Sequence, residues 1–122
     1  MHTYSFEKLE VWKLAKDLSV FLYKITAKFP VEERFVLVSQ IRRASVSIAS
    51  NIAEGSSRIS QKDQAYFYTI AFSSTIEVLN QLIICEELEF INQDQLVECR
   101  LKVEHITRAL SKLKQSILNP KP

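Results

Sequence analysis

The sequence predicts an all-α protein: an antiparallel up-down-up-down bundle of four helices that forms a single domain over residues 1–122. The chain contains one glycine and three prolines, whereas a β-rich chain of this size needs many turns built from glycine and proline. Apolar residues recur at the three- and four-residue spacing of helices in four long segments. The links between these segments are short, which forces neighbouring helices to run antiparallel.

The first two predicted helices cover residues 7–29 and residues 32–54. Pro30 ends the first helix, because a proline removes a backbone donor and clashes with the preceding turn. Two glutamates in the first turn of the second helix favour its positive N-terminal end. Gly55 is expected just past the C-terminus of the second helix, in the left-handed conformation common at that position.

The last two predicted helices cover residues 61–89 and residues 93–117. Ser60 and Asp63 have the spacing of a capping box, which marks the start of the third helix. Asn92 is a typical N-cap for the fourth helix. One apolar stripe runs along the fourth helix, so we expect it to bury one side and to lie on the outside of any assembly.

The third predicted helix carries two apolar stripes, about 150° apart at 100° per residue. A second apolar face also lies on the first helix, away from its main stripe. A broad core-facing arc with scattered surface residues is one explanation. A large exposed apolar patch that mediates homo-oligomerisation is the explanation we favour. The candidate interface residues are Trp12, Val20, Tyr23, Phe72, Ile76, Leu79 and Ile83.

Charge and composition limit the classes of function. The formal net charge is +2, and residues 1–62 hold ten of the 16 basic residues but six of the 14 acidic ones. A local basic patch is therefore expected, whereas a strongly basic chain is excluded. The sequence shows neither the apolar core of a signal peptide nor an uncharged apolar stretch of about 18 residues. We expect a cytoplasmic protein that does not contact a membrane.

No pattern in the sequence predicts a catalytic, metal, cofactor or small-molecule site. One glycine cannot build a phosphate-binding loop. Cys85 and Cys99 lack the spacing of a zinc motif and are expected to be buried, inert thiols. Arg100 and His105 resemble the Arg-x4-His signature of HEPN ribonucleases, but side chains five residues apart on a helix point about 140° apart. A ribonuclease is therefore a remote alternative.

The second predicted helix has the most unusual sequence, with two adjacent arginines among small and hydrogen-bonding side chains. One interpretation is that Arg42 or Arg43 forms an internal ion pair with Glu77 or Glu54. The other interpretation is that the two arginines contact phosphates of a nucleic acid. The residues alone leave both interpretations open.

The chain resembles the bacterial four-helix family named for 23S rRNA intervening sequences, and the accessory protein of diversity-generating retroelements is similar. The resemblance covers about residues 6–117, with Val36 and Ser73 where the family usually has glycine. Its most specific block lies in the second helix. The matching residues are Phe6, Leu9, Val11, Trp12, Ala15, Phe29, Pro30, Glu33, Gln40, Ile41, Arg42, Arg43, Ala44, Ser47, Ile48, Asn51, Ile52, Ala53, Glu54, Gly55, Ser60, Ile70, Ala71, Ser74 and Glu77.

This resemblance implies a homo-oligomer, typically a pentamer, that binds nucleic acid through Arg42 and Arg43. Charge alone adds Arg34, Arg58 and Lys62 as candidate contacts for RNA or DNA. The leading hypothesis is therefore a non-enzymatic oligomeric bundle that binds structured RNA or DNA. The alternative is a scaffold that engages another protein and no nucleic acid.

Overall fold

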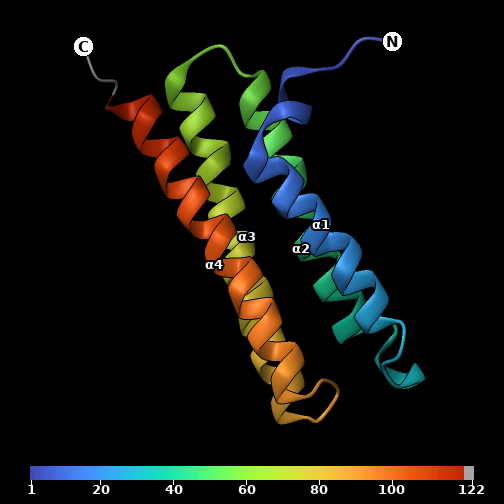
Figure 1. The fold of residues 1–122 in the computed structure, drawn as a ribbon. Helices are drawn as coiled ribbons and strands as arrows, with labels where there is room; N and C mark the ends of the chain where they lie inside the picture. The colour runs from blue at the N-terminus through green and yellow to red at the C-terminus, as the bar shows by residue number, and fades with distance from the viewer. Residues whose placement is uncertain (120–122) are drawn as a thin grey trace.

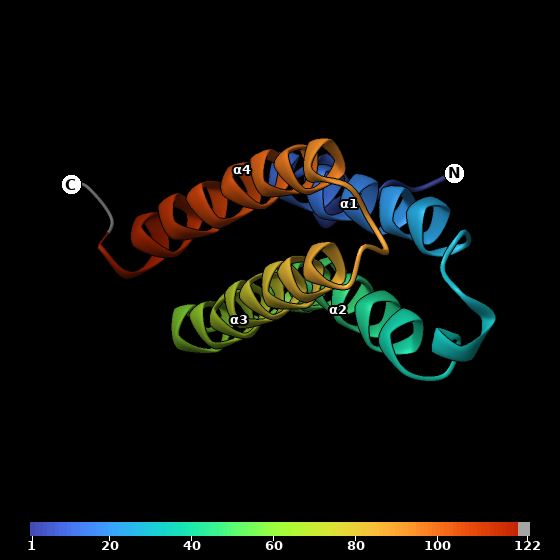
Figure 2. The same ribbon diagram turned by 90° about the horizontal axis from the view of Figure 1, so that it is seen from below.

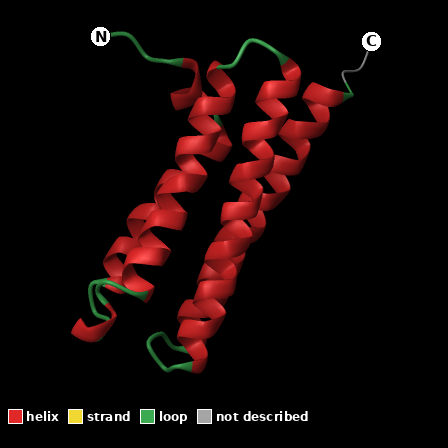
Figure 3. Cartoon of the chain, turned by 180° about the vertical axis from the view of Figure 1, so that it is seen from behind, coloured by secondary structure: helices red, strands yellow, loops and turns green. Residues whose placement is uncertain are grey.

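The computed structural model describes residues 1–119. Within this range the chain forms four α-helices and two short 3-10 helices, and the described residues contain no strand (Figure 3). The elements in chain order are η1 (Ser5–Lys8), α1 (Glu10–Thr26), η2 (Val31–Glu33), α2 (Leu37–Ser57), α3 (Gln61–Glu87) and α4 (Gln93–Leu118). The predicted all-α bundle is confirmed.

The four helices pack as neighbouring antiparallel pairs. Figure 1 shows α1 beside α2 and α3 beside α4, and the turned view in Figure 2 shows α1 beside α4 and α2 beside α3. The most extensive contact joins α2 to α3, and the least extensive contact between neighbouring helices joins α1 to α4. The α1–α2 and α3–α4 connections lie at the same end of the bundle (Figure 1).

The core consists of the inward faces of all four helices, because each helix repeats an apolar side chain every three or four residues. Aliphatic side chains dominate it, and the two cysteines contribute to it. Its largest fully buried members are Leu18, Leu22, Ile41, Ile48, Ile52, Val78, Leu82, Cys85, Cys99, Ile106 and Leu110.

Small polar residues of α2 hydrogen-bond across both of its helix contacts. The hydroxyl groups of Ser19 and Ser45 share a hydrogen bond of 3.2 Å between α1 and α2. On the other side, the hydroxyls of Ser47 and Ser74 share one of 3.1 Å between α2 and α3. Serines are short, so these bonds form only where two helices come close together. They satisfy polar groups that would otherwise destabilise the bundle interior.

The first helix is shorter than the predicted residues 7–29. Leu9 is extended, with φ −74° and ψ 125°, and separates η1 from α1. After Thr26 the backbone tightens into turns, in which the Phe29 amide donates to the Thr26 carbonyl at 3.1 Å. These turns bring Phe29 back into the core before Pro30 redirects the chain.

The second helix starts at Leu37 rather than at residue 32. Glu32 and Glu33 form the 3-10 helix η2 instead of the first turn of α2. Val36 then lies outside helical geometry, with φ −116° and ψ −98°, and no side chain caps the start of α2. The acidic residues alone therefore do not set this boundary, because no N-cap residue accompanies them.

Gly55 lies inside α2, which continues to Ser57, so the prediction of a left-handed glycine past the helix end is wrong. The glycine serves close packing instead. A Cβ atom at Gly55 would lie 2.7 Å from Cε1 of Tyr68 on α3. The absence of a side chain lets α2 and α3 approach each other at this point.

The predicted starts of the last two helices are confirmed. The Ser60 hydroxyl accepts a hydrogen bond from the Asp63 amide at 3.0 Å. The Asn92 side chain accepts one from the Gln95 amide at 2.8 Å, and the Gln95 side chain accepts one from the Asn92 amide at 2.8 Å, which completes a capping box. The third helix ends two residues before its predicted end.

Contacts within the bundle cover part of the second apolar stripe of α3. Phe72 and Leu79 pack against the core, since α3 has both α2 and α4 as neighbours. Ile76 remains 46% exposed. Among the described helices, α3 is also the one with the length and apolar composition of a membrane-crossing helix, a property that core helices of soluble bundles share.

Candidate functional site

An open groove lies at the end of the bundle where α1 connects to α2, with a volume of about 490 Å³. Its walls come from the last turns of α1, the connecting segment and the first three turns of α2. The lining residues are Tyr23, Arg34, Phe35, Val38, Ser39, Arg42, Arg43 and Val46. Three of these eight residues are arginines and none is acidic.

A second, smaller hollow of about 230 Å³ adjoins this groove on the side of the connecting segment. The two hollows share Arg34, Val38 and Arg42. They therefore form one continuous surface, which we call the arginine groove.

Contacts with the end of α1 hold Arg42 in place. Its Nε donates to Thr26 Oγ1 at 3.0 Å, and its Nη2 donates to the Tyr23 carbonyl at 3.1 Å. The guanidinium carbon lies 4.4 Å from the centre of the Tyr23 ring. A cation at this position also stabilises the negative C-terminal end of the α1 dipole.

Neither Arg42 nor Arg43 forms the predicted ion pair with Glu54 or Glu77. Glu54 pairs with Arg58 at 2.8 Å, and the Glu77 carboxylate accepts a hydrogen bond from Gln81 at 3.2 Å. The internal ion pair is therefore wrong for the described part of the chain. Arg42 is instead bonded to neutral oxygen atoms, so its positive charge is not neutralised by a carboxylate.

Arg34 and Arg43 are exposed and line the same groove. The ion pairs found among residues 1–119 involve other side chains, so these two guanidinium groups keep their charge available at the groove surface. The structure thus brings three of the five predicted nucleic-acid contacts together.

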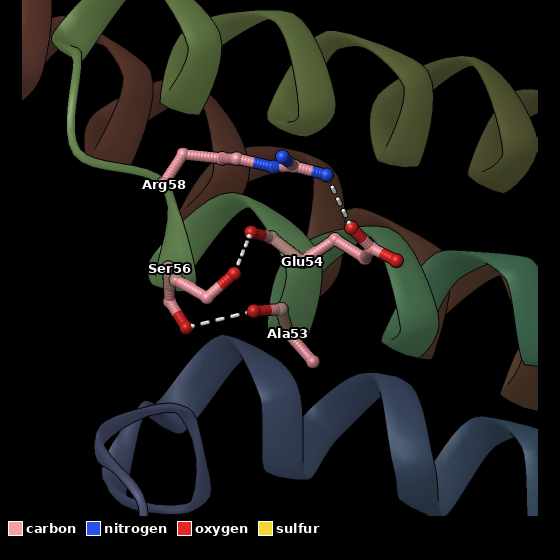
Figure 4. Close-up of polar contacts among 5 residues, drawn as sticks. Ala53, Glu54, Ser56 and Arg58 are labelled. Atoms are coloured by element: carbon pink, nitrogen blue, oxygen red, sulfur yellow. Dashed lines mark hydrogen bonds and ion pairs between the residues drawn. The ribbon is translucent and has the colours of Figure 1, made fainter.

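The other two predicted contacts, Arg58 and Lys62, lie at the opposite end of α2. Sixteen residues of helix separate Arg42 from Arg58, roughly 24 Å at 1.5 Å per residue. Arg58 is bonded to Glu54 (Figure 4), and its guanidinium carbon lies 4.6 Å from the Phe67 ring centre. Hydroxyls of the last turn of α2 bond back to carbonyls in the same figure. The Arg58 side chain is therefore engaged in contacts within the protein at the C-terminal end of α2.

Phe35 is the groove residue that the sequence analysis did not select. It is 86% exposed and lies between the exposed residues Arg34 and Val36 on the connecting segment. An apolar ring beside an arginine in a short connection was the signal that the sequence offered. The functional significance of the Phe35 ring depends on the groove, which is visible only in the folded structure.

Three of the seven predicted interface residues, Val20, Tyr23 and Ile76, are exposed on α1 and α3, whereas Trp12, Phe72 and Leu79 pack against the core. Val20 and Tyr23 are 50% and 43% exposed on α1. On α3, Ile76 is exposed and Ile83 half-buried, and the exposed residues Tyr66, Ile84 and Leu88 were not among the predicted set. Trp12 is half-buried and makes an edge contact with Phe6, with ring centres 5.0 Å apart.

The remaining reactive groups do not form a catalytic constellation within residues 1–119. No three His, Cys, Asp or Glu side chains come together there. Burial raises the pKa of the Cys85 and Cys99 thiols to about 11, which disfavours the reactive thiolate. Arg100 and His105 are both exposed on the single continuous helix α4, where their spacing directs them to different sides.

Four packed helices with an open cationic groove define a helical-bundle protein, and the comparisons with known proteins identify the family. The chain belongs to the 23S rRNA-intervening sequence protein family, whose sequence profile matches residues 7–112. The predicted resemblance is confirmed. No curated protein matches the chain.

A solved structure from Bacteroides thetaiotaomicron has a similar fold. It is described as a protein with unknown function from the S23 ribosomal protein family, and it is 23% identical to this chain. The TM-score is 0.77, over 86% of this chain and 98% of the other. At that identity the likeness establishes the shared four-helix fold and nothing beyond it.

Proposed function

We propose that this protein is a non-enzymatic, self-assembling helical bundle that binds structured RNA or DNA through the arginine groove. The observation that carries the proposal is the lining of the groove, in which three arginines meet and no carboxylate is present. An uncompensated set of guanidinium groups favours a polyanion, and phosphates are the anions that arginine recognises with two parallel hydrogen bonds.

Arg42 supports this proposal through its fixed position. Two hydrogen bonds and the Tyr23 ring hold its guanidinium group in the groove wall. A side chain that is already ordered loses less conformational freedom when a ligand arrives. Arg34 and Arg43 are exposed and free to adjust to the spacing of successive phosphates.

RNA is the first ligand to test, because the matched family and the similar structure are both described in words that refer to ribosomal components. Phosphate contacts carry little sequence information. We therefore expect binding that depends on the charge of the nucleic acid and its salt environment more than on its sequence.

The test is fluorescence anisotropy with a labelled structured RNA and a labelled duplex DNA over a salt series. We expect log affinity to fall linearly with log salt, and each lost contact with a duplex phosphate to reduce the slope by about 0.9. Arg34→Ala and Arg43→Ala should weaken binding, whereas Arg108→Ala on exposed α4 is the matched control. No binding at low salt would contradict the proposal.

Self-assembly is proposed on the outer surfaces of α1 and α3. The outer surface of α3 carries the exposed residues Ile76 and Ile84, and the chain has no Lys or Arg from residue 63 to residue 99. The outer surface of α1 carries Val20 among several lysines, whereas Tyr23 lines the arginine groove. The two surfaces complement each other in charge, so a head-to-tail contact that closes into a ring is favoured, consistent with a pentamer.

A protein-binding scaffold is the second candidate function. The observation that favours it is the apolar part of the groove, where Phe35, Val38 and Val46 could pack against a partner helix with acidic residues. Protein binding of this kind depends on apolar burial, so it should persist at salt concentrations that abolish the binding of a nucleic acid.

A further inference from the structure

We infer that the arginine groove binds an unpaired nucleotide, with the base stacked on the ring of Phe35 and the adjoining phosphates held by Arg34 and Arg43. This inference rests on the proposed function and specifies the class of nucleic acid: single-stranded or looped segments rather than continuous duplex. The chemistry needed is one free aromatic face beside two mobile cations.

Phe35 has an unusual position for an apolar side chain. It is 86% exposed, and its neighbours on the connecting segment, Val31 and Val36, are 69% and 50% exposed. Single exposed apolar residues are common on protein surfaces. This one lies directly after Arg34 in the chain and lines the same groove as Arg42 and Arg43, so a ligand bound by the cations is also close to the ring.

The two aromatic rings of the groove are not equivalent. The face of Tyr23 is already covered by the Arg42 guanidinium at 4.4 Å. Within the part of the chain that the structure describes, Phe35 has neither an aromatic nor a cationic partner. Phe35 is therefore the ring in this groove with a face available for stacking.

The exposed ring distinguishes unpaired from paired nucleotides. In a duplex each base is stacked between its neighbours and offers no face to a protein side chain, whereas bases in loops and single strands can stack on aromatic residues. Phosphates are present in both forms and reach the arginines equally. The arginines thus supply affinity for any nucleic acid, and Phe35 supplies the preference for an unpaired one.

Charge favours a nucleotide over a second copy of the chain as the occupant. Arg34, Arg42 and Arg43 all line one groove, and a polynucleotide supplies a phosphate at every residue. On α3, Asp63 and Glu77 are isolated acidic residues, and the adjacent pair Glu86 and Glu87 point about 100° apart on the helix. One face of α3 therefore presents one of these carboxylates to the groove at a time.

The test compares a labelled single-stranded RNA with the duplex of the same strand, at equal salt. We expect Phe35→Ala to weaken single-strand binding by roughly 5- to 100-fold, the range for loss of one stacked base, and to leave duplex binding within about twofold. Phe35→Tyr, which keeps an aromatic ring, should bind the single strand with an affinity close to that of the wild type. Ile59→Ala is the matched control, because Ile59 is equally apolar, 101% exposed and at the opposite end of α2.

Three results would overturn the inference. Equal loss of single-strand and duplex binding in Phe35→Ala would show that the ring does not read unpaired bases, while the proposed function would stand. A lower native mass of Phe35→Ala would place the ring in a contact between copies. Failure of the wild-type protein to bind either nucleic acid would remove the inference and the proposed function together.

Discussion

Arg42 contributes both to the stability of the fold and to the positive charge of the groove. Its hydrogen bonds to Thr26 Oγ1 and to the Tyr23 carbonyl link α2 to the last turn of α1, where the same carbonyl also accepts the Ala27 amide at 3.2 Å. The same bonds place a positive charge in the wall of the groove. A test of nucleic-acid binding that relies on Arg42→Ala therefore confuses a loss of stability with a loss of contact, whereas Arg43 avoids this problem.

Replacement of Arg42 should destabilise the fold. We expect Arg42→Ala to lower the free energy of unfolding by about 1–3 kcal/mol, because it removes two hydrogen bonds from a charged donor and a favourable charge at the end of α1. Arg42→Lys should retain only part of this free energy of unfolding, since an ammonium group cannot reach both oxygen atoms as a planar guanidinium does. Urea unfolding followed by circular dichroism, at one protein concentration, measures the difference.

The control is Arg43→Ala, which removes an exposed arginine one residue away and should change stability by about 0.5 kcal/mol or less. If Arg42→Ala were as stable as Arg43→Ala, the end of α1 would not depend on the guanidinium group.

The two buried thiols predict a loss of stability at high pH. Burial raises the pKa of Cys85 and Cys99 from 9.0 to about 11, and nearby Glu33 and Glu98 act in the same direction. Between these values the unfolded chain releases the thiol protons and the folded chain retains them. The stabilisation is therefore complete below about pH 9 and is lost as the pH rises to about 11.

Urea midpoints measured from neutral pH to pH 11 test this prediction. The wild-type midpoint should fall more steeply above pH 9 than that of Cys85→Ala/Cys99→Ala, whatever the stability of the variant at neutral pH. Parallel curves would mean that the thiols do not contribute. In the native protein at pH 8, both thiols should react with a thiol reagent far more slowly than after unfolding.

At the scale of the helices, local sequence signals predicted some boundaries well. Ser60 and Asn92 act through hydrogen bonds within three residues, so their effect is readable from the sequence. The role of Gly55, in contrast, depends on a contact with another helix. Gly55 is needed because Tyr68 lies against it, and no pattern around residue 55 indicates that neighbour.

The apolar periodicity of α3 likewise predicted only part of what the structure shows. The two stripes correctly indicate a helix with more than one covered side, but they do not reveal which side another helix of the same bundle covers. Phe72 and Leu79 pack against the core of the bundle. The exposed remainder, with Ile76, Ile84 and Leu88, is the part that would contact a second copy in the proposed assembly.

A charge on this exposed surface should block assembly without unfolding the bundle. We expect Ile76→Glu/Ile84→Glu to lower the native mass, because the two side chains are 46% and 42% exposed in the isolated chain and would be desolvated in a contact between copies. Native mass spectrometry or light scattering measures the mass, and circular dichroism should show unchanged helix content.

Val97→Glu/Leu101→Glu is the matched control for this experiment, since both side chains are 52% exposed on α4 and the two substitutions give the same change of charge. It should keep the native mass of the wild type. A wild-type protein that is already monomeric at micromolar concentration would contradict self-assembly directly.

At the scale of the whole molecule, only part of the candidate site could be predicted from the sequence. The adjacent pair Arg42 and Arg43 indicates a cationic surface from the sequence alone, because both belong to one unusual helix. The sequence does not indicate that the α1–α2 connection brings Arg34 to them, or that Arg58 lies roughly 24 Å away along α2. The order of basic residues along the chain does not show which of them lie together on the folded surface.

Assembly and the groove together predict avidity. In the proposed ring, several arginine grooves would be available to one RNA, so a long RNA would engage more than one of them, whereas a short hairpin would engage one. For multivalent binding the gain is about 100-fold or more when the sites can be occupied simultaneously. The non-assembling variant Ile76→Glu/Ile84→Glu should therefore bind a long RNA at least about 100-fold more weakly than the wild type.

The same variant should bind the short hairpin with an affinity close to that of Val97→Glu/Leu101→Glu, which adds the same charge and is expected to keep the native mass of the wild type. Its salt slope for the long RNA should also be smaller, because fewer phosphates are neutralised in each complex. Equal affinity of the wild type and the variant for long RNA would show that the copies act independently. Loss of hairpin binding as well would show that one groove requires residues from two copies.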